Sequence, residues 1–218
     1  MTSRENILAR IRARQGKNPV PTDAERAAVR AHIQAHPGSA RPRMDWDPVA
    51  RFRERALGLA STVDEVETLA AVPAAVARYL EASGLPRAAV CWQELVALDW
   101  SGAGVRVEAR AARDTDLVGI TGAFCAVAET GTLMTISGRD TPAAVSLLPE
   151  THVAVVRASR IVRGMEEAWQ LARGELGRLP RSVNFISGPS RTADIEQTVT
   201  LGAHGPYRVH VIVVARAD

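Results

Sequence analysis

Two continuous apolar runs constrain the fold of this chain most strongly. HVAVVR at residues 152–157 and RVHVIVV at residues 208–214 carry apolar, mostly β-branched residues at nearly every position. A strand with one face in water would alternate apolar and polar residues, so these runs are typical of strands buried on both faces. Buried strands need a covering layer on each side, which a parallel sheet in an α/β protein provides.

Strand-like and helix-like segments take turns along the rest of the chain after Pro48. We expect helices at 49–59, 73–82 and 165–173, the last ended by Gly174, and a short helix opened by Thr141. We expect strands at 62–66, 88–92, 105–109, 152–157, 182–186 and 208–214. Residues 117–136 are small or β-branched and indicate buried sheet, broken at Gly122 and turned at 129–131. The pattern predicts a three-layer α/β/α fold around a mainly parallel sheet.

Residues 1–47 have a different character from the remainder. They are rich in proline and poor in large apolar residues, which indicates an arm and linker before a domain at 48–218. Ser3 is expected to cap a short helix with Ile7, Leu8 and Ile11 on one face, and a second helix is expected near 24–35. The first helix is too short to be stable alone, so it docks either on its own domain or on a partner.

The composition excludes several classes of function. The 27 basic and 24 acidic residues form a mixed surface, and only 4% of residues are aromatic, so we expect no nucleic-acid binding. Lys17 is the only lysine, and Asn18 follows it. A Walker A loop needs lysine followed by serine or threonine, and a Schiff-base enzyme needs a buried lysine, so both classes are excluded. Gly102 and Gly104 lack the third glycine of a dinucleotide-binding loop.

We expect no metal site and no cofactor in this chain. Cys91 and Cys125 are too few and too far apart for a four-thiolate cluster. His32 and His36 would share a helix face, but no third ligand accompanies them, so a solvated face is the better interpretation. The sequence shows no apolar signal core and no run long enough to span a membrane, which favours a cytoplasmic protein with free thiols.

The first candidate site is the polar segment SGPSRTADIE at 187–196. It follows the strand expected at 182–186 and leads toward a short helical segment, and ligands of parallel sheets bind beyond the carboxyl ends of the strands. Backbone amides after Gly188, with the Arg191 guanidinium, are suited to hold a carboxylate or a phosphate. The alternative is that the hydroxyls cap the chain while Arg191 pairs internally with Asp194 or Glu196. The ligand-binding candidates are Ser187, Gly188, Ser190, Arg191, Thr192 and Asp194.

The second candidate site is the turn formed by Glu129, Thr130, Gly131 and Thr132. A glutamate among Ala, Val and Leu would have a raised pKa unless it is hydrogen-bonded, and it could then serve as a nucleophile or general base. The three residues after it are candidates for ligand binding. The alternative is a turn carboxylate that accepts hydrogen bonds from the amides of Gly131 and Thr132.

His204 is the histidine of a glycine-containing loop, LGAHGP at 201–206. Its ring could act as an acid, a base or a hydrogen-bond donor to a ligand, or it could fix the loop by a hydrogen bond. We interpret His152 and His210 as structural, because both lie inside expected strands.

Three segments together resemble the LUD-domain family, specifically the lactate utilization protein C group (LutC/YkgG). They are ITGAFCAVAETGTL at 120–133, SLLPETHVAVVRASRIV at 146–162 and NFISGPSRTADIEQTVTLGAHGP at 184–206. The similarity covers residues 48–218 and the arginine-bearing start of the chain. This chain departs from the group's usual small polar pair at Phe124 and Cys125.

The resemblance implies a fold like that of ribose-5-phosphate isomerase, glucosamine-6-phosphate deaminase and coenzyme A transferases. It further implies a subunit that oxidises L-lactate to pyruvate together with partner proteins, of which at least one is an iron-sulfur protein. The family brings no catalytic assignment for Glu129, Arg191 or His204, and whether this chain is itself an enzyme stays open. A small carboxylate ligand and a homo-oligomer are both compatible with the sequence.

Two alternative functions remain open at this stage. One is a stand-alone transferase or isomerase that uses Glu129 on a thioester or sugar phosphate. The other is a regulatory module that senses a metabolite. Co-purification with iron-sulfur proteins separates the subunit hypothesis from both.

Overall fold

The computed structural model describes residues 2–18, 20–36, 38, 40–192 and 200–216. The chain divides into two compact units, residues 1–43 and residues 44–218. Within the described residues, no helix has the length and apolar character needed to span a bilayer.

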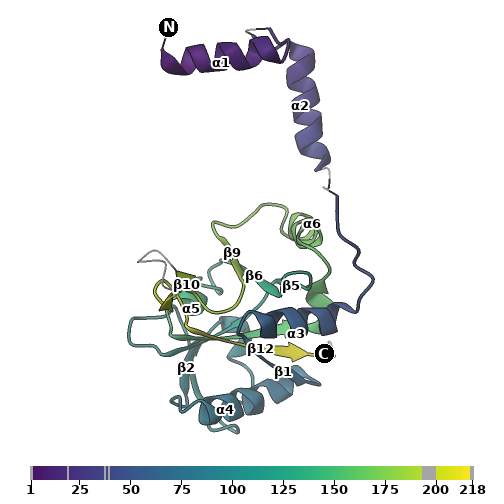
Figure 1. Ribbon diagram of the computed structural model, residues 1–218. Helices are drawn as coiled ribbons and strands as arrows, with labels where there is room; N and C mark the ends of the chain where they lie inside the picture. Colours follow the sequence, from purple (N-terminus) through teal and green to yellow (C-terminus); the bar gives the residue numbers. More distant parts are fainter. Residues whose placement is uncertain (1, 19, 37, 39, 193–199, 217–218) are drawn as a thin grey trace. The chain divides into compact units, whose positions relative to one another are not determined.

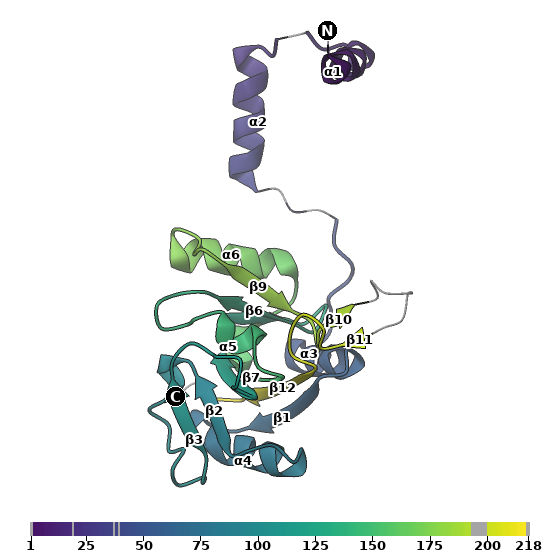
Figure 2. The ribbon, with the colours of Figure 1, turned by 90° about the vertical axis from the view of Figure 1, so that its left-hand side faces the viewer.

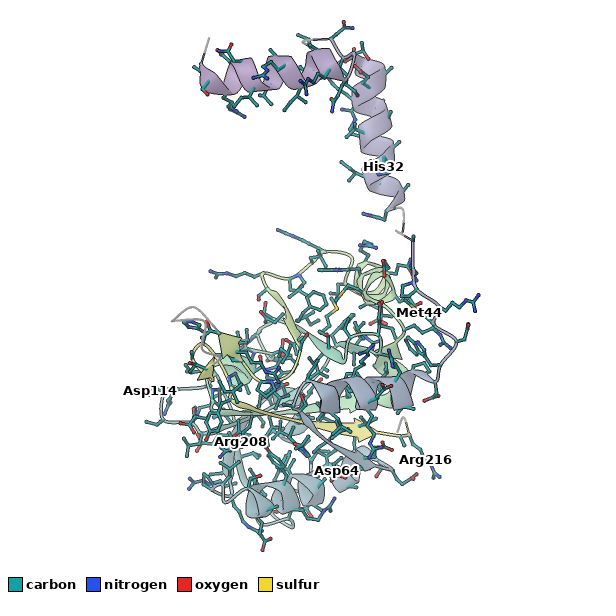
Figure 3. All side chains as sticks on the ribbon, in the orientation of Figure 1. His32, Met44, Asp64, Asp114, Arg208 and Arg216 are labelled. Atoms are coloured by element: carbon teal, nitrogen blue, oxygen red, sulfur yellow. The ribbon has the colours of Figure 1, made fainter. Side chains whose placement is uncertain are left out.

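The first unit consists of two helices, α1 (Ser3–Arg14) and α2 (Asp23–Ala35), neither of which has a buried residue. The expected cap at Ser3 is wrong by one residue. Thr2 caps α1 because the Glu5 carboxylate accepts from the Thr2 amide while the Thr2 hydroxyl accepts from the Glu5 amide, which is a complete capping box. Figure 3 labels His32 on α2. His36 has a left-handed backbone, with φ 44°, and ends the helix, so the two histidines do not share one helix face.

A six-stranded sheet forms the centre of the second unit. Its strands are β1 (Thr62–Val66), β12 (Arg208–Val214), β7 (Thr151–Arg157), β4 (Val118–Gly122), β2 (Ala88–Cys91) and β3 (Arg106–Ala109), in this spatial order. Every neighbouring pair is parallel. The two apolar runs that opened the sequence analysis lie side by side as β7 and β12, with His210 opposite Val153. The predicted mainly parallel α/β fold is confirmed.

Helices cover both faces of this sheet, as Figure 1 shows for α3 (Pro48–Gly58) and α4 (Val72–Ala82). The apolar side of α4 packs on one face, where Val76 and Leu80 meet Val153 and Ile212. On the opposite face, Phe52 of α3 packs with Val211 and its neighbours. The remaining short helical segments are η1 (Leu69–Ala71), η2 (Gln93–Leu95), α5 (Ala144–Leu147) and η3 (Ala158–Arg160).

A second, smaller sheet lies over the α3 side of the molecule. It contains β8 (Ile161–Val162), β5 (Cys125–Val127), β6 (Thr132–Ile136) and β9 (Val183–Ile186), and β6 is antiparallel to both β5 and β9. Figure 2 shows β6 and β9 between the central sheet and α6 (Met165–Leu176). The expectation that 182–186 belongs to the parallel sheet is wrong. Asn184 interrupts the apolar run, and the strand forms an outer edge instead of a buried interior position.

Two further boundaries differ from expectation. Gly174 does not end α6, because Leu176 packs on the second sheet and the helix continues until Gly177, whose φ of 61° stops it. The segment after the 187–190 loop is a strand, β10 (Arg191–Thr192), paired antiparallel with β11 (Thr200–Leu201). The rest of the expected helical segment lies outside the described residues.

Candidate functional site

The turn predicted at 129–131 joins β5 to β6 and presses against α3. Gly131 has φ 68°, and its amide donates to the carbonyl of Val127 at 2.9 Å. A Cβ at Gly131 would lie 2.6 Å from the backbone nitrogen of Ala56 and 2.7 Å from the carbonyl carbon of Arg55. A residue other than glycine therefore fits neither the backbone conformation nor the space.

The two polar segments singled out in the sequence meet through a chain of hydroxyls. The Thr132 hydroxyl is hydrogen-bonded to that of Thr130 at 2.8 Å and to that of Ser187 at 2.7 Å. Thr132 is almost fully buried, so these bonds satisfy a polar group that water does not reach. We call Thr130, Thr132 and Ser187 the hydroxyl cluster.

The loop after the hydroxyl cluster also packs on the end of α3. Gly188 has φ 76°, and a Cβ there would lie 2.4 Å from the carbonyl oxygen of Leu59. The Arg191 guanidinium donates to the same oxygen at 2.8 Å. Because Leu59 is the C-cap of α3, Arg191 places a positive charge at the negative end of the helix dipole. The internal partner of Arg191 is thus a helix carbonyl, and Asp194 and Glu196 lie outside the described residues.

The other predicted site residues are spread over this region. The Ser190 amide donates to the carbonyl of Pro206 at 2.8 Å, and Thr192 lies in β10 opposite Thr200. His204 is exposed, and its ring makes no hydrogen bond with the described part of the chain. The structure therefore brings together Thr130, Thr132 and Ser187. It also packs the loop of His204 against Ser190, since a Cβ at Gly205 would lie 3.4 Å from the Cβ of Ser190.

Glu129 is half-buried beside α6 and not within the hydroxyl cluster. Its amide donates to the carbonyl of Arg163 at 3.0 Å. A Cβ built on Gly164 would lie 3.7 Å from Oε2 of Glu129 and 3.4 Å from Oε2 of Glu166, so the two carboxylates share one neighbourhood. The Gly131 amide bonds to Val127, so it does not satisfy the Glu129 carboxylate as the sequence-based alternative had it.

A pocket of about 360 Å³ opens at the carboxyl ends of the parallel strands. The chain leaves β2 toward β3 on one side and leaves β4 toward β7 on the other, so the strand order reverses between β2 and β4. Open parallel sheets bind ligands in the crevice at such a reversal. We call this the switch-point pocket. Its polar and aromatic lining consists of Glu94, Phe124, Arg157, Arg160 and Glu175, and Gly122 lies beside Glu94.

Glu94 places a carboxyl over the last residue of β4. A Cβ at Gly122 would lie 1.9 Å from Oε1 of Glu94, so the absence of a side chain at 122 makes room for this carboxyl. Glu94 as a whole is exposed, and its carboxyl end lies directly over the backbone of Gly122. Burial raises the pKa of the Glu94 carboxyl, and the charge of Arg157 offsets part of that rise.

Arg160 forms one wall of the switch-point pocket and is fully engaged. Its Nε donates to the carbonyl of Phe124 at 2.8 Å, and its two terminal nitrogens donate to the Glu175 carboxylate at 2.6 and 2.9 Å. The guanidinium also lies 4.7 Å from the centre of the Phe124 ring. The aromatic residue at 124 thus belongs to a pocket wall.

This pocket was not predicted from the sequence, although a signal for it exists. Glu94 follows β2, Gly122 ends β4 and Arg157 ends β7, so each lies at the carboxyl end of a strand of the same parallel sheet. No group of three metal-binding side chains occurs among the residues that the structure describes.

Comparisons with known proteins identify related sequences and folds. Residues 62–214 match the family model for the LUD domain. Lactate utilization protein C of Halalkalibacterium halodurans is 43% identical over 102 residues, which are 44% of this chain and 44% of that protein. Lactate utilization protein C of Bacillus subtilis (strain 168) is 40% identical over 101 residues, which are 45% of this chain and 42% of that protein. These alignments therefore span less than half the length of the curated relatives.

A solved structure extends the similarity to most of the fold. The crystal structure of a DUF162 family protein from Deinococcus radiodurans is 27% identical and superposes with a TM-score of 0.58. The superposition covers 77% of this chain and 96% of that protein. The central sheet and its covering layers are thus shared with a protein of known structure.

Proposed function

Since this chain belongs to the LUD-domain family, we propose that it is a component of an L-lactate utilization system that oxidises L-lactate to pyruvate. The observation that carries the proposal is the identity of about 40% to proteins named lactate utilization protein C. In this proposal the chain is a cytoplasmic subunit that works with iron-sulfur partner proteins and holds no redox centre of its own.

The cysteines of this chain do not fit the ligand set of an iron-sulfur cluster. Such clusters are held by thiolates, commonly four of them. Cys91 lies on β2 of the central sheet and Cys125 on β5 of the second sheet, and both side chains are buried. Burial raises the pKa of each thiol to about 11, which keeps it protonated at neutral pH. The proposal therefore puts the clusters in the partner proteins.

The switch-point pocket supports a role that involves a small organic acid. It combines the guanidinium of Arg157, which forms neither a hydrogen bond nor an ion pair within the described part of the chain, with apolar lining from Leu69, Leu95 and Val155. Small-molecule sites commonly have this composition, mostly apolar with a few placed polar groups. Glu129, the carboxylate that the stand-alone enzyme hypothesis would use, does not line this pocket.

Deletion of the gene tests the proposal in the organism that carries it. The deletion strain should fail to grow on L-lactate, grow normally on glucose and recover when the full-length chain is supplied. A tagged chain should retain iron-sulfur proteins when it is purified from lactate-grown cells. Normal growth on L-lactate without a second copy of the gene would contradict the proposal, as would turnover of a thioester or sugar phosphate by the isolated chain that Glu129→Gln abolishes.

A further inference from the structure

The two arginines of the switch-point pocket differ in what their guanidinium groups contact. Arg160 is committed to Glu175 and to the carbonyl of Phe124. Arg157, at the end of β7, is exposed and forms neither a hydrogen bond nor an ion pair with any residue that the structure describes. It is still close enough to Glu94 to act on that carboxyl electrostatically. Arg157 therefore offers its donors to a ligand, whereas Arg160 holds the wall.

We propose that the switch-point pocket binds a small 2-hydroxy or 2-oxo acid together with a proton. The ligand carboxylate pairs with Arg157, and the Glu94 carboxyl, in its protonated form, donates a hydrogen bond to an oxygen of the ligand. The choice of acid rests on the proposed function, and the inference deepens it by naming the site and the ligand chemistry.

Charge balance is the reason for the proton. A ligand carboxylate and an ionised Glu94 in one pocket would repel each other, and two carboxylates that share a site raise the pKa of one of them. Burial raises the pKa of the Glu94 carboxyl, and the charge of an arriving anion raises it further. The ligand then meets one positive group, Arg157, and one neutral donor, Glu94.

The other charged groups of the pocket do not alter this balance. Arg160 comes from η3 and Glu175 from α6, and they neutralise each other through two hydrogen bonds. Arg157 comes from the end of β7 and is the remaining charged group of the lining that faces Glu94.

The size of the pocket limits the ligand to a compact molecule. A volume of about 360 Å³ lies near the lower end of the range for small-molecule sites. A three-carbon acid fits with space to spare, and a somewhat larger acid fits as well. Gly122 is the residue that sets this space beside Glu94, because any side chain there would occupy the position of the carboxyl.

Isothermal titration of the purified full-length chain with L-lactate and with pyruvate tests the inference. In the wild type, affinity should fall up to about tenfold per unit as the pH rises above the pKa of Glu94. In that range, titrations in buffers of different ionisation heat should show uptake of about one proton per ligand bound. Acetate serves as the probe for carboxylate binding without a second oxygen and should bind more weakly than either acid.

Three variants separate the contributions. Arg157→Gln should weaken binding by about tenfold or more, because a charge-assisted hydrogen bond is lost. Glu94→Gln keeps a donor at the same place, so it should still bind but take up no proton and lose the pH dependence. Arg106→Gln removes an exposed arginine at the amino end of β3, whereas the pocket lies at the carboxyl ends of the strands. This variant should bind both acids like the wild type. Thermal melting of each variant verifies that it is folded.

Several outcomes would overturn the inference. It fails if neither acid binds, if Arg157→Gln binds like the wild type, or if Glu94→Gln still takes up a proton. Growth of the deletion strain reports on the proposed function independently. A deletion strain that cannot use L-lactate, with a chain that binds no acid, leaves the proposed function standing and rejects this site. If the chain binds the acid but the deletion strain grows normally on L-lactate, the site stands and the proposed function is rejected.

Discussion

The hydroxyl cluster and the switch-point pocket differ in where their polar groups are directed. Thr130, Thr132 and Ser187 bond to one another, and the neighbouring Arg191 bonds to the end of α3. In the switch-point pocket, Glu94 and Arg157 line an opening and form neither a hydrogen bond nor an ion pair with each other. The first region uses its polar groups to hold the fold together, and the second keeps them available.

This contrast shows why a dense polar sequence is a weak guide to a site. SGPSRT at 187–192 gathers hydroxyls and a guanidinium within a few residues, yet the Ser187 hydroxyl and the Arg191 guanidinium both bond to other parts of the fold. The residues of the pocket are scattered over more than a hundred positions, from Leu69 to Glu175. Polar groups that the protein leaves without a partner are the better indication of ligand binding.

Alanine at two glycines should separate the two regions with the largest effect. In Gly188→Ala the new Cβ meets the Leu59 carbonyl at 2.4 Å on a backbone with φ 76°, so we expect a loss of about 2 to 5 kcal/mol in the free energy of unfolding. In Gly122→Ala the new Cβ meets the movable end of the Glu94 side chain at 1.9 Å. The free energy of unfolding should therefore change little, while binding of the 2-hydroxy or 2-oxo acid is lost. Urea unfolding and calorimetric titration measure the two quantities.

Gly174→Ala is the matched control, because a Cβ there meets nothing within 4 Å and the residue lies inside α6. It should leave both stability and binding close to wild type, or raise stability slightly through helix propensity. The comparison breaks down if Gly188→Ala leaves stability unchanged or if Gly122→Ala binds normally.

Acidic pH should destabilise the domain through residues that belong to neither region. Burial lowers the pKa of His152 and of His210 to about 4 from the ordinary 6.5. Above pH 6.5 both histidines are neutral in the folded and the unfolded chain, so their contribution to stability is fully present. Between pH 6.5 and about 4, the unfolded chain binds protons at these histidines and the folded chain does not, so stability falls. Each histidine should therefore cost about 3 kcal/mol of unfolding free energy as the pH falls to about 4. Denaturant unfolding at a series of pH values measures this loss.

The histidine effect has its own variants. His210→Gln should remove about half of the acid loss, although it also gives up the stacking of His210 on Tyr79, whose rings lie 3.9 Å apart. His204→Gln, at an exposed position, should leave the free energy of unfolding at neutral pH close to that of the wild type. If the free energy of unfolding of His210→Gln depends on pH as that of the wild type does, groups other than His210 dominate unfolding at acidic pH.

The smallest expected effect is that of Arg191. Arg191→Gln should lower the free energy of unfolding by about 1 kcal/mol or less, because a partly exposed cation leaves a helix C-terminus. Acid binding should stay at the wild-type level, as measured by titration. A loss of binding with retained stability would return the 187–192 loop to the list of ligand sites and would contradict the contrast drawn above.

The sequence predicted the main elements well because their signals are local. Continuous apolar runs identified β7 and β12, and the turn at 129–131 was confirmed by the positive φ of Gly131. The second sheet was missed because β5, β6 and β9 are short, and antiparallel pairing between residues some fifty positions apart leaves no periodic trace. The pocket was missed because the order of strands in a sheet decides which carboxyl ends become neighbours, and no single segment encodes that order.

The pairing of β1 with β12 has a consequence for how the chain folds. The hydrogen bond between the Thr62 hydroxyl and Nδ1 of His210 joins residues 148 positions apart. β1 is an edge strand whose sheet neighbour is β12. It therefore has no strand to pair with until residues 208–214 have been synthesised. Contacts so distant in sequence slow folding, and they leave an open strand edge exposed to other chains during synthesis. The sheet thus closes late, with the same pair of strands that encloses His210.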